Sequence, residues 1–246
     1  MVVPIELAGS WTGVHASSSL LSCLVISIGF AALAFSVGAV NRSGAVAGAM
    51  VSFLLCAGGG FAALTALIAV FVLAWLTTKI GYQRKARIGA AEKIEGRDAF
   101  QVLANLGVAS ACAILYAFEG KAIFLLAVAA SLSEAAADTV SSEIGQLSNE
   151  KARLITTWKA VPAGTDGGVT VLGTASGLAA AIVVSTVCIL GGMVPRNRAG
   201  IPILAAFSGS LADSFLGAVL ERRRLLSNDL VNFLGTLIAA LIALGA

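Results

Sequence analysis

Long apolar stretches recur along this chain, and they lack the strict alternation of apolar and polar residues that marks a half-buried strand. They are rich in Ala, Leu and Gly, and most approach the roughly 20 residues that a helix needs to cross a hydrocarbon core of about 30 Å. Because a segment in lipid must satisfy its own backbone hydrogen bonds, helices are expected and strands are not. The predicted segments are residues 17–40, 44–56, 61–76, 99–117, 123–140, 169–191, 201–220 and 231–244.

The second segment is short, and three consecutive glycines at 58–60 follow it. The second and third segments therefore either form a re-entrant pair or make one long broken helix. The helix count is about eight, with a range of seven to nine. We predict an all-α, polytopic membrane helix bundle that forms a single transmembrane domain over residues 1–246.

Composition supports this fold class. The chain is 58% hydrophobic and 12% charged, and its mean hydropathy is +0.95, which is far outside the usual range for a soluble domain. We therefore predict an integral membrane protein. The first basic residue is Arg42, so the region before the first apolar segment lacks the positive charge of a cleavable signal peptide, and the first helix is expected to stay.

The basic residues predict how the segments are oriented. When the loops are assigned alternately to two sides, 13 of the 16 Lys and Arg residues fall on one side. The positive-inside rule then puts these basic loops in the cytoplasm and both termini outside. We expect a bacterial-type inner or plasma membrane.

The four cysteines each lie alone in an apolar segment, without the spacing of metal ligands. We predict that Cys23, Cys56, Cys112 and Cys188 are small buried core residues.

Carboxylates follow the fifth apolar run, in the stretch LSEAAADTVSSEIGQ at 132–146. Glu134 and Asp138 are four residues apart and share one face of a helix, which Ser141 and Ser142 extend into a polar stripe. Glu143 is about half a turn away from Glu134, so it joins this face only if the helix ends or bends. Asp138 is expected in the cytoplasmic half of the membrane or at its headgroup boundary.

A second carboxylate, Asp213, lies inside the seventh apolar segment, next to Ser214 and on a face of small residues. Since the fifth and seventh segments run in the same direction, Asp138 and Asp213 should lie at similar depth. Two such carboxylates can hold one Mg²⁺ together with its waters. Ionisable groups at membrane depth are expensive, so a functional metal or proton site is the default interpretation.

A glycine-rich stretch precedes the sixth segment and contains Gly164, Thr165, Gly167 and Gly168. Exposed backbone amides before a helix can bind an anion, and Lys159 can reinforce such a site. The spacing is not that of a P-loop.

The segment 77–105 is strongly basic, with six cations and three acids. About half of its charge is explained as a topology signal that extends toward anionic lipid. Gln101 and Asn105 share a helix face, and Asn232 lies near the inner end of the last helix. Polar groups beside a basic loop suit a headgroup site.

Several of these stretches also carry a family resemblance. TTKIGYQRK, GRDAFQVLANLGVA, SEAAADTVSSEIG, PAGTDGGVTVLGTASG, LADSFLGAVLE and NDLVNFLGTLIAAL follow one another between about residues 41 and 244. Together they resemble the family of integral membrane proteins that includes transmembrane protein 19 and plant phytyl-phosphate kinase. The resemblance implies phosphoryl transfer from a nucleoside triphosphate, with CTP favoured, to a prenyl or polyprenyl monophosphate. Asp166 stands where an Asn is common in that family.

The resemblance and the residues suggest one set of roles. Asp138 and Asp213 would bind Mg²⁺, and Glu134 would be a further ligand or orient them. The nucleotide and acceptor phosphates would be held by Lys79, Lys85, Arg97, Lys159 and the amides of residues 164–168. The remaining polar lining would be Gln101, Asn105, Ser141, Ser142, Glu143, Ser214 and Asn232.

The expected partners are a nucleoside triphosphate, a prenyl-phosphate lipid and the membrane, with no nucleic acid. The alternative is a secondary transporter that uses Glu134, Asp138 and Asp213 as a cation or proton site. Inverted repeats and carboxylates at the membrane midplane would favour that alternative. A lipid-binding protein without chemistry would leave the aspartate pair unexplained.

Overall fold

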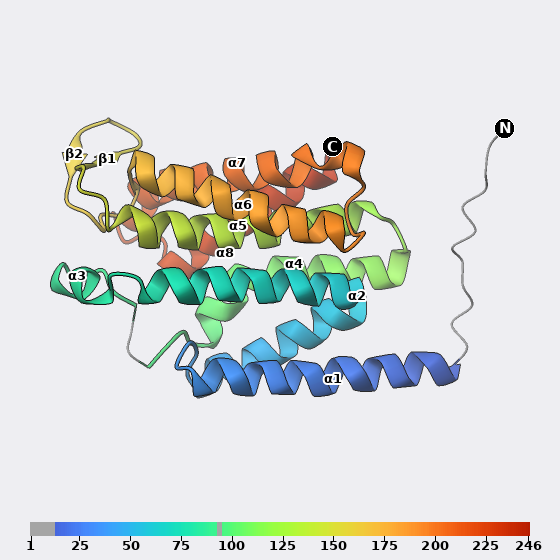
Figure 1. Cartoon of the computed structure of the whole chain (residues 1–246). Coiled ribbons are helices and arrows are strands. Elements are labelled where there is room, and N and C mark those ends of the chain that lie inside the picture. Colours follow the sequence, from blue (N-terminus) through green and yellow to red (C-terminus); the bar gives the residue numbers. More distant parts are fainter. Residues whose placement is uncertain (1–12, 93–94) are drawn as a thin grey trace.

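Helices of membrane-spanning length dominate the computed structural model, which describes residues 13–92 and 95–246, with side chains from residue 19 onward (Figure 1). Within this described part, six helices are long and apolar enough to cross a membrane, and α8 is a shorter apolar helix. The predicted all-α polytopic bundle is confirmed. The helices are α1 (Gly13–Ser36), α2 (Arg42–Lys79), α3 (Tyr82–Arg87), α4 (Ala99–Glu119), α5 (Ile123–Gly145), α6 (Val171–Leu190), α7 (Gly200–Leu216) and α8 (Asn228–Leu244).

Helix α2 reverses direction at Gly60, whose backbone (φ 75°, ψ −174°) is not helical and favours glycine. The first arm, residues 42–59, ends beside the far part of α4, where a Cβ on Gly58 would lie 2.4 Å from the carbonyl oxygen of Ala113. The second arm, residues 61–79, returns, and Thr78 donates a hydrogen bond to Glu143 at the end of α5. The two arms are thus separate passes, as Figure 1 shows, and they correspond to the second and third predicted segments.

Helix α5 occupies the centre of the bundle and is the most thoroughly buried of the spanning helices. Helix α6 packs closely against it through two glycines four residues apart. A Cβ on Gly173 would lie 2.7 Å from the carbonyl oxygen of Ser141, and one on Gly177 would lie 2.7 Å from that of Ala137. Small residues at this spacing let two helix backbones approach, which is how membrane helices pack tightly.

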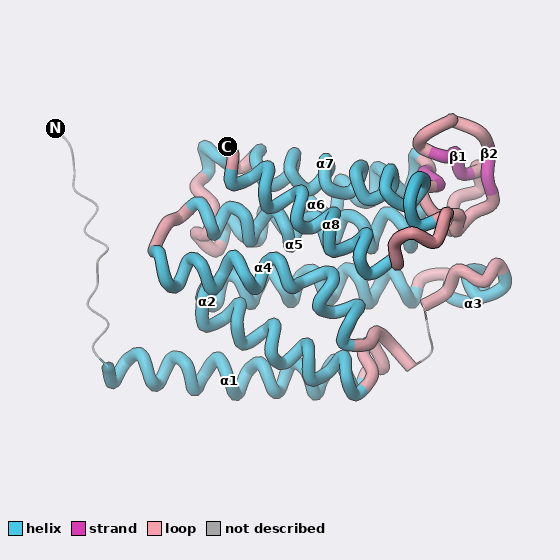
Figure 2. Tube along the Cα trace, turned by 180° about the vertical axis from the view of Figure 1, so that it is seen from behind, coloured by secondary structure: helices cyan, strands magenta, loops and turns pink. Residues whose placement is uncertain are grey.

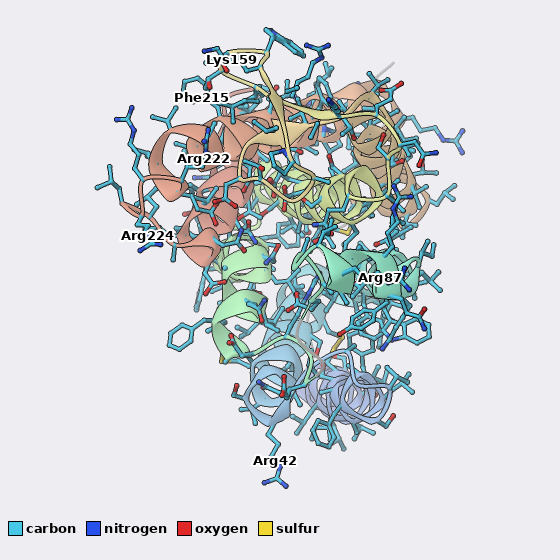
Figure 3. The ribbon with its side chains drawn as sticks, turned by 90° about the vertical axis from the view of Figure 1, so that its left-hand side faces the viewer. Arg42, Arg87, Lys159, Phe215, Arg222 and Arg224 are labelled. Carbon is cyan, nitrogen blue, oxygen red and sulfur yellow. A yellow bond between two sulfur atoms is a disulfide. The ribbon has the colours of Figure 1, made fainter. Side chains whose placement is uncertain are left out.

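One end of the bundle, called here the basic end, carries α3 and a three-stranded antiparallel sheet in the loop between α5 and α6 (Figure 2). The strands are β1 (Ala152–Leu154), β2 (Ala160–Val161) and β3 (Gly168–Val169), in the order β2-β1-β3. The sheet was not expected, because strands of two or three residues leave no readable periodicity. Figure 3 looks onto this end, where Arg42, Lys159 and Arg224 lie around the rim.

Two of the cysteines are joined. Cys23 of α1 and Cys56 of the first arm of α2 form a disulfide, with their Cα atoms 5.6 Å apart. Both are buried core residues, as predicted, but no sequence pattern indicates the bond, because their proximity depends on how α1 packs against α2. Cys112 and Cys188 are buried, as predicted, and are not bonded to another cysteine.

Candidate functional site

A polar cavity of about 370 Å³ opens at the basic end, between the ends of α4, α5, α7 and α8 and the loop before α6. It brings together most of the polar residues that the sequence singled out. The predicted residues on its wall are Arg97, Gln101, Asn105, Asp138, Ser141, Ser142, Glu143, Gly164, Thr165, Gly167, Gly168, Asp213, Ser214 and Asn232.

Asp138 of α5 and Asp213 of α7 meet at the deep end of this cavity. Both helices run toward the basic end, so the two side chains reach the same depth, and their carboxyl groups are close enough to interact directly. The Oδ2 atom of Asp213 is buried and has no hydrogen-bond partner in the described part of the chain. Two adjacent carboxylates repel each other, so the arrangement favours a bound cation or a shared proton.

Glu134 lies one helical turn deeper than Asp138 and is only 1% exposed. It is wedged between α7 and α8, where a Cβ on Gly209 would lie 2.7 Å from its Cγ and one on Gly235 would lie 2.5 Å from its Oε1. This Oε1 atom has no partner among the described residues. Glu134 does not line the polar cavity, so its position suits the orienting role rather than direct contact with a ligand.

Glu143 and Lys85 form a buried ion pair. The Lys85 ammonium also donates to the carbonyl oxygens of Thr77, at 2.8 Å, and Thr78, at 2.9 Å. The other Glu143 oxygen accepts a hydrogen bond of 2.9 Å from the Thr78 hydroxyl. An ammonium has three hydrogens, and all three are used here. The structure thus gives Lys85 a structural role beside the cavity and leaves it no hydrogen for the predicted phosphate contact.

The other predicted cations differ in position. Arg97 lies on the wall of the polar cavity, with its Nε 3.6 Å from a carboxylate oxygen of Glu92. Lys159 is exposed in the turn between β1 and β2, and Lys79 lines a separate apolar cavity. Among the described residues, Arg97 is therefore the one cation on the polar wall.

Three carboxylates on this wall were not predicted as site residues: Glu92, Asp166 and Glu221. Glu221 ends the π-helical turn Gly217–Glu221 that continues α7. A π-turn holds more residues per turn than an α-helix, which rotates Glu221 back toward the face of Asp213. No sequence pattern predicts that turn. Asp166 was noticed only as a departure from the family pattern.

The glycine-rich loop packs against the same π-turn. Gly164 and Gly167 have positive φ values of 80° and 72°, and a Cβ on Gly167 would lie 2.5 Å from the backbone nitrogen of Ala218. At the start of α6, the Thr170 side chain accepts a hydrogen bond from the Gly173 amide. The loop backbone therefore closes one side of the polar cavity, directly before a helix amino terminus.

Oxygen atoms at this cavity could bind Mg²⁺. The described residues contain no group of three or more His, Cys, Asp or Glu side chains arranged to hold a metal ion by themselves. Mg²⁺ is usually bound through one or two carboxylates while it keeps several waters and contacts phosphate. The Asp138–Asp213 pair fits that mode, and the amide oxygens of Gln146 and Asn232, which have no partner in the described ranges, lie at the same cavity.

Comparison with known proteins identifies relatives over most of the chain. An uncharacterised membrane protein of Methanocaldococcus jannaschii is 34% identical over 206 residues, which cover 82% of this chain and 84% of the relative. Protein VTE6, chloroplastic, of Arabidopsis thaliana is 32% identical over 83% of this chain, and the match spans 64% of that protein's length. Protein PGR of the same plant is 31% identical over 82% of this chain and 79% of its own length.

No solved structure matches the chain significantly. The sequence model of the integral membrane protein family DUF92 matches residues 25–240, a range that contains the aspartate pair, the glycine-rich loop and all the described helices except parts of α1 and α8. The chain therefore belongs to the DUF92 family of integral membrane proteins.

Proposed function

We propose that this protein transfers a phosphoryl group from a nucleoside triphosphate, with CTP favoured, to a prenyl or polyprenyl monophosphate, giving the diphosphate. The observation that carries the proposal is the Asp138–Asp213 pair, which lies in a polar cavity that borders an apolar one. The motif resemblance to a family that includes plant phytyl-phosphate kinase supports it. The relatives VTE6 and PGR show that this family extends into plants.

In the proposed reaction, an oxygen of the acceptor monophosphate attacks the γ-phosphorus of the nucleotide. The bond from that phosphorus to the bridging oxygen breaks, and its electron pair leaves with the nucleoside diphosphate. Phosphoryl transfer asks the protein mainly for positioning and charge neutralisation. An acceptor monophosphate is already anionic at neutral pH, so the site needs no strong general base.

Different residues at the cavity would have different roles in this reaction. Asp138 and Asp213 would hold Mg²⁺, which when bound neutralises charge on the phosphates. Glu134, packed against Gly209 and Gly235, would orient the aspartates from behind. Arg97 would bind a phosphate, since a guanidinium offers several hydrogens in a fixed plane.

The position of the site also suits a lipid substrate. The polar cavity lies where α5 and α7 reach the basic end, so a phosphate there can meet a water-soluble nucleotide while an attached tail stays in the membrane. The excess of basic residues at this end supports a cytoplasmic location, under the positive-inside rule.

A kinase assay tests the proposal. Purified protein in detergent is mixed with Mg²⁺, a panel of labelled nucleoside triphosphates and geranylgeranyl or phytyl monophosphate, and lipid diphosphate is measured by chromatography. Asp138→Asn and Asp213→Asn are each expected to lower turnover at least about 100-fold. Glu119→Gln is the matched control, because Glu119 pairs with Lys121 at the opposite end of the bundle. A folded protein that gives no diphosphate with any nucleotide would refute the proposal.

One observation supports the transporter alternative: the buried Oε1 of Glu134, behind the two aspartates, has no hydrogen-bond partner among the described residues. Three carboxylates in succession resemble a relay. The site nevertheless lies toward one end of parallel helices, whereas transporters bind their cargo near the midplane. Proton or Na⁺ flux through the protein in sealed liposomes, abolished by Glu134→Gln, would favour this alternative over the kinase.

A further inference from the structure

A second cavity, about 550 Å³ in volume and mostly apolar, lies between α1, both arms of α2, α4 and α5. Five residues line both this apolar cavity and the polar one: Glu92, Arg97, Gln101, Asn105 and Thr139. The two cavities therefore adjoin along one shared wall. A ligand that fits both must have a charged head and an apolar tail.

We infer that the apolar cavity holds the prenyl chain of the acceptor lipid and limits the chain length that the protein accepts. This inference rests on the proposed function, since it assigns the head of the same lipid to the polar cavity. Arg97, on the shared wall, is positioned to meet the phosphate where head and tail join.

The depth of the cavity provides the length limit. Its wall on the second arm of α2 runs from Lys79 to Leu67, which at 1.5 Å per residue is about 18 Å. An extended chain advances roughly 1.2 Å per bond, so about fifteen carbon–carbon bonds fit, close to the main chain of about four isoprene units. On the first arm of α2 the lining ends at Gly48, and the next inward-facing residues, Val51 and Leu55, are buried in the core. A much longer chain would have to leave it.

Small residues on α1 and on the first arm of α2 create the space. Ala31, Ala34 and Gly48 lie on the wall, as do Phe30 and Phe71, whose rings pack edge to face with their centroids 5.1 Å apart. A Cβ added to Gly48 would meet no described heavy atom within 4 Å. Gly48 is helical, so a larger side chain there enters the cavity without backbone strain.

This gives a sharp test. Gly48→Leu is expected to fill the cavity. Gly107→Leu is its matched control: Gly107 lies in the spanning helix α4, and a Cβ added there would also meet no described heavy atom within 4 Å. Gly107 does not line the cavity. Equilibrium binding of radiolabelled geranylgeranyl monophosphate, without nucleotide, is measured in detergent. Gly48→Leu is expected to weaken binding at least tenfold, and Gly107→Leu to leave it unchanged. Ala34→Leu, on the opposing helix, serves as a second filling variant.

Chain length adds a second readout. Geranyl monophosphate is too short to fill the cavity, so its binding should be much less sensitive to Gly48→Leu. Undecaprenyl monophosphate should bind the unaltered protein more weakly than the geranylgeranyl lipid. Equal binding of all three lipids, or no effect of both filling variants, would overturn the inference.

The outcomes for the inference and for the proposed function are separable. If the protein is an active kinase and Gly48→Leu keeps full turnover with geranylgeranyl monophosphate, the tail lies elsewhere and only the inference falls. If binding depends on Gly48 but no nucleotide yields diphosphate, the proposed function falls and the tail site stands. A protein that binds no prenyl monophosphate contradicts both.

Discussion

Gly235 of α8 lies so close to Glu134 of α5 that a Cβ at this glycine would be 2.5 Å from the carboxylate oxygen Oε1. Gly235→Ala should therefore force the buried side chain to move or the helices to separate, at a cost of about 1–3 kcal/mol in unfolding free energy. Thermal unfolding in detergent measures this cost. Gly107→Ala, which adds the same methyl group where no described heavy atom lies nearby, should change stability little.

A double variant tests whether the loss of stability comes from the contact with Glu134 or from a general disturbance of α8. If Glu134 is the neighbour that Gly235→Ala displaces, shortening it in Gly235→Ala/Glu134→Ala should recover most of the lost stability, although activity stays low. Equal destabilisation with and without Glu134 would contradict this contact.

Because Lys85 is buried in an ion pair with Glu143, removing it should lower stability strongly but leave substrate binding nearly unchanged. Lys85→Met leaves a buried carboxylate without its counter-ion, so unfolding free energy should fall by roughly 3–5 kcal/mol. KM for both substrates should remain within about twofold in the fraction that folds, because Lys85 has no hydrogen left for phosphate. Denaturation curves and initial-rate kinetics give the two quantities.

The comparison for Lys85 is the pair of Lys121 and Glu119, which lies at the opposite end of the bundle with Lys121 mostly exposed. Lys121→Met should cost less than about 1 kcal/mol, as exposed ion pairs usually do. A large increase in nucleotide KM for Lys85→Met, without loss of stability, would instead restore the original prediction of a phosphate contact.

Arg97 should matter for the acceptor. Since it lies on the wall that both cavities share, Arg97→Ala is expected to lower kcat/KM for the prenyl monophosphate about 10- to 100-fold, which corresponds to roughly 1.4–2.7 kcal/mol. Arg97→Lys should recover only part of this, because a single ammonium cannot donate in a fixed plane. Arg42→Ala, at the rim of the same end, should keep normal kinetics (Figure 3). An equal loss in both alanine variants would point to general surface charge instead.

The disulfide between Cys23 and Cys56 predicts a thiol count. Alkylation of the denatured protein should modify two cysteines before reduction and four after it, as read by mass spectrometry. Cys23→Ala should lower unfolding free energy by roughly 2–4 kcal/mol, since the bond joins segments 33 residues apart. Four reactive thiols in carefully oxidised protein would show that the bond does not form.

The bundle itself was largely predictable, because apolar length and the requirement for internal backbone hydrogen bonds leave few alternatives in a membrane. The meeting of Asp138 and Asp213 also followed from the sequence, since two parallel segments carry one carboxylate each at similar depth. The reversal at Gly60 was anticipated as one of two possibilities, and the backbone geometry of that glycine decides between them.

Other features depend on contacts between distant segments. Basic residues look alike in sequence, yet Lys85 is held by Glu143 while Arg97 reaches the cavity. Glu221 joins the site only because a π-turn rotates it, and Cys23 meets Cys56 only through helix packing. In each case, the partner of the residue depends on tertiary packing between segments that are distant in the sequence.

The shared wall between the two cavities also has an evolutionary consequence. The carboxylates belong to α5 and α7, whereas much of the apolar space is shaped by α1 and α2. Substitutions in the first third of the chain can therefore retune which lipid is accepted without touching the groups assigned to the chemistry. Members of one family could in this way diversify their substrates while conserving a common reaction.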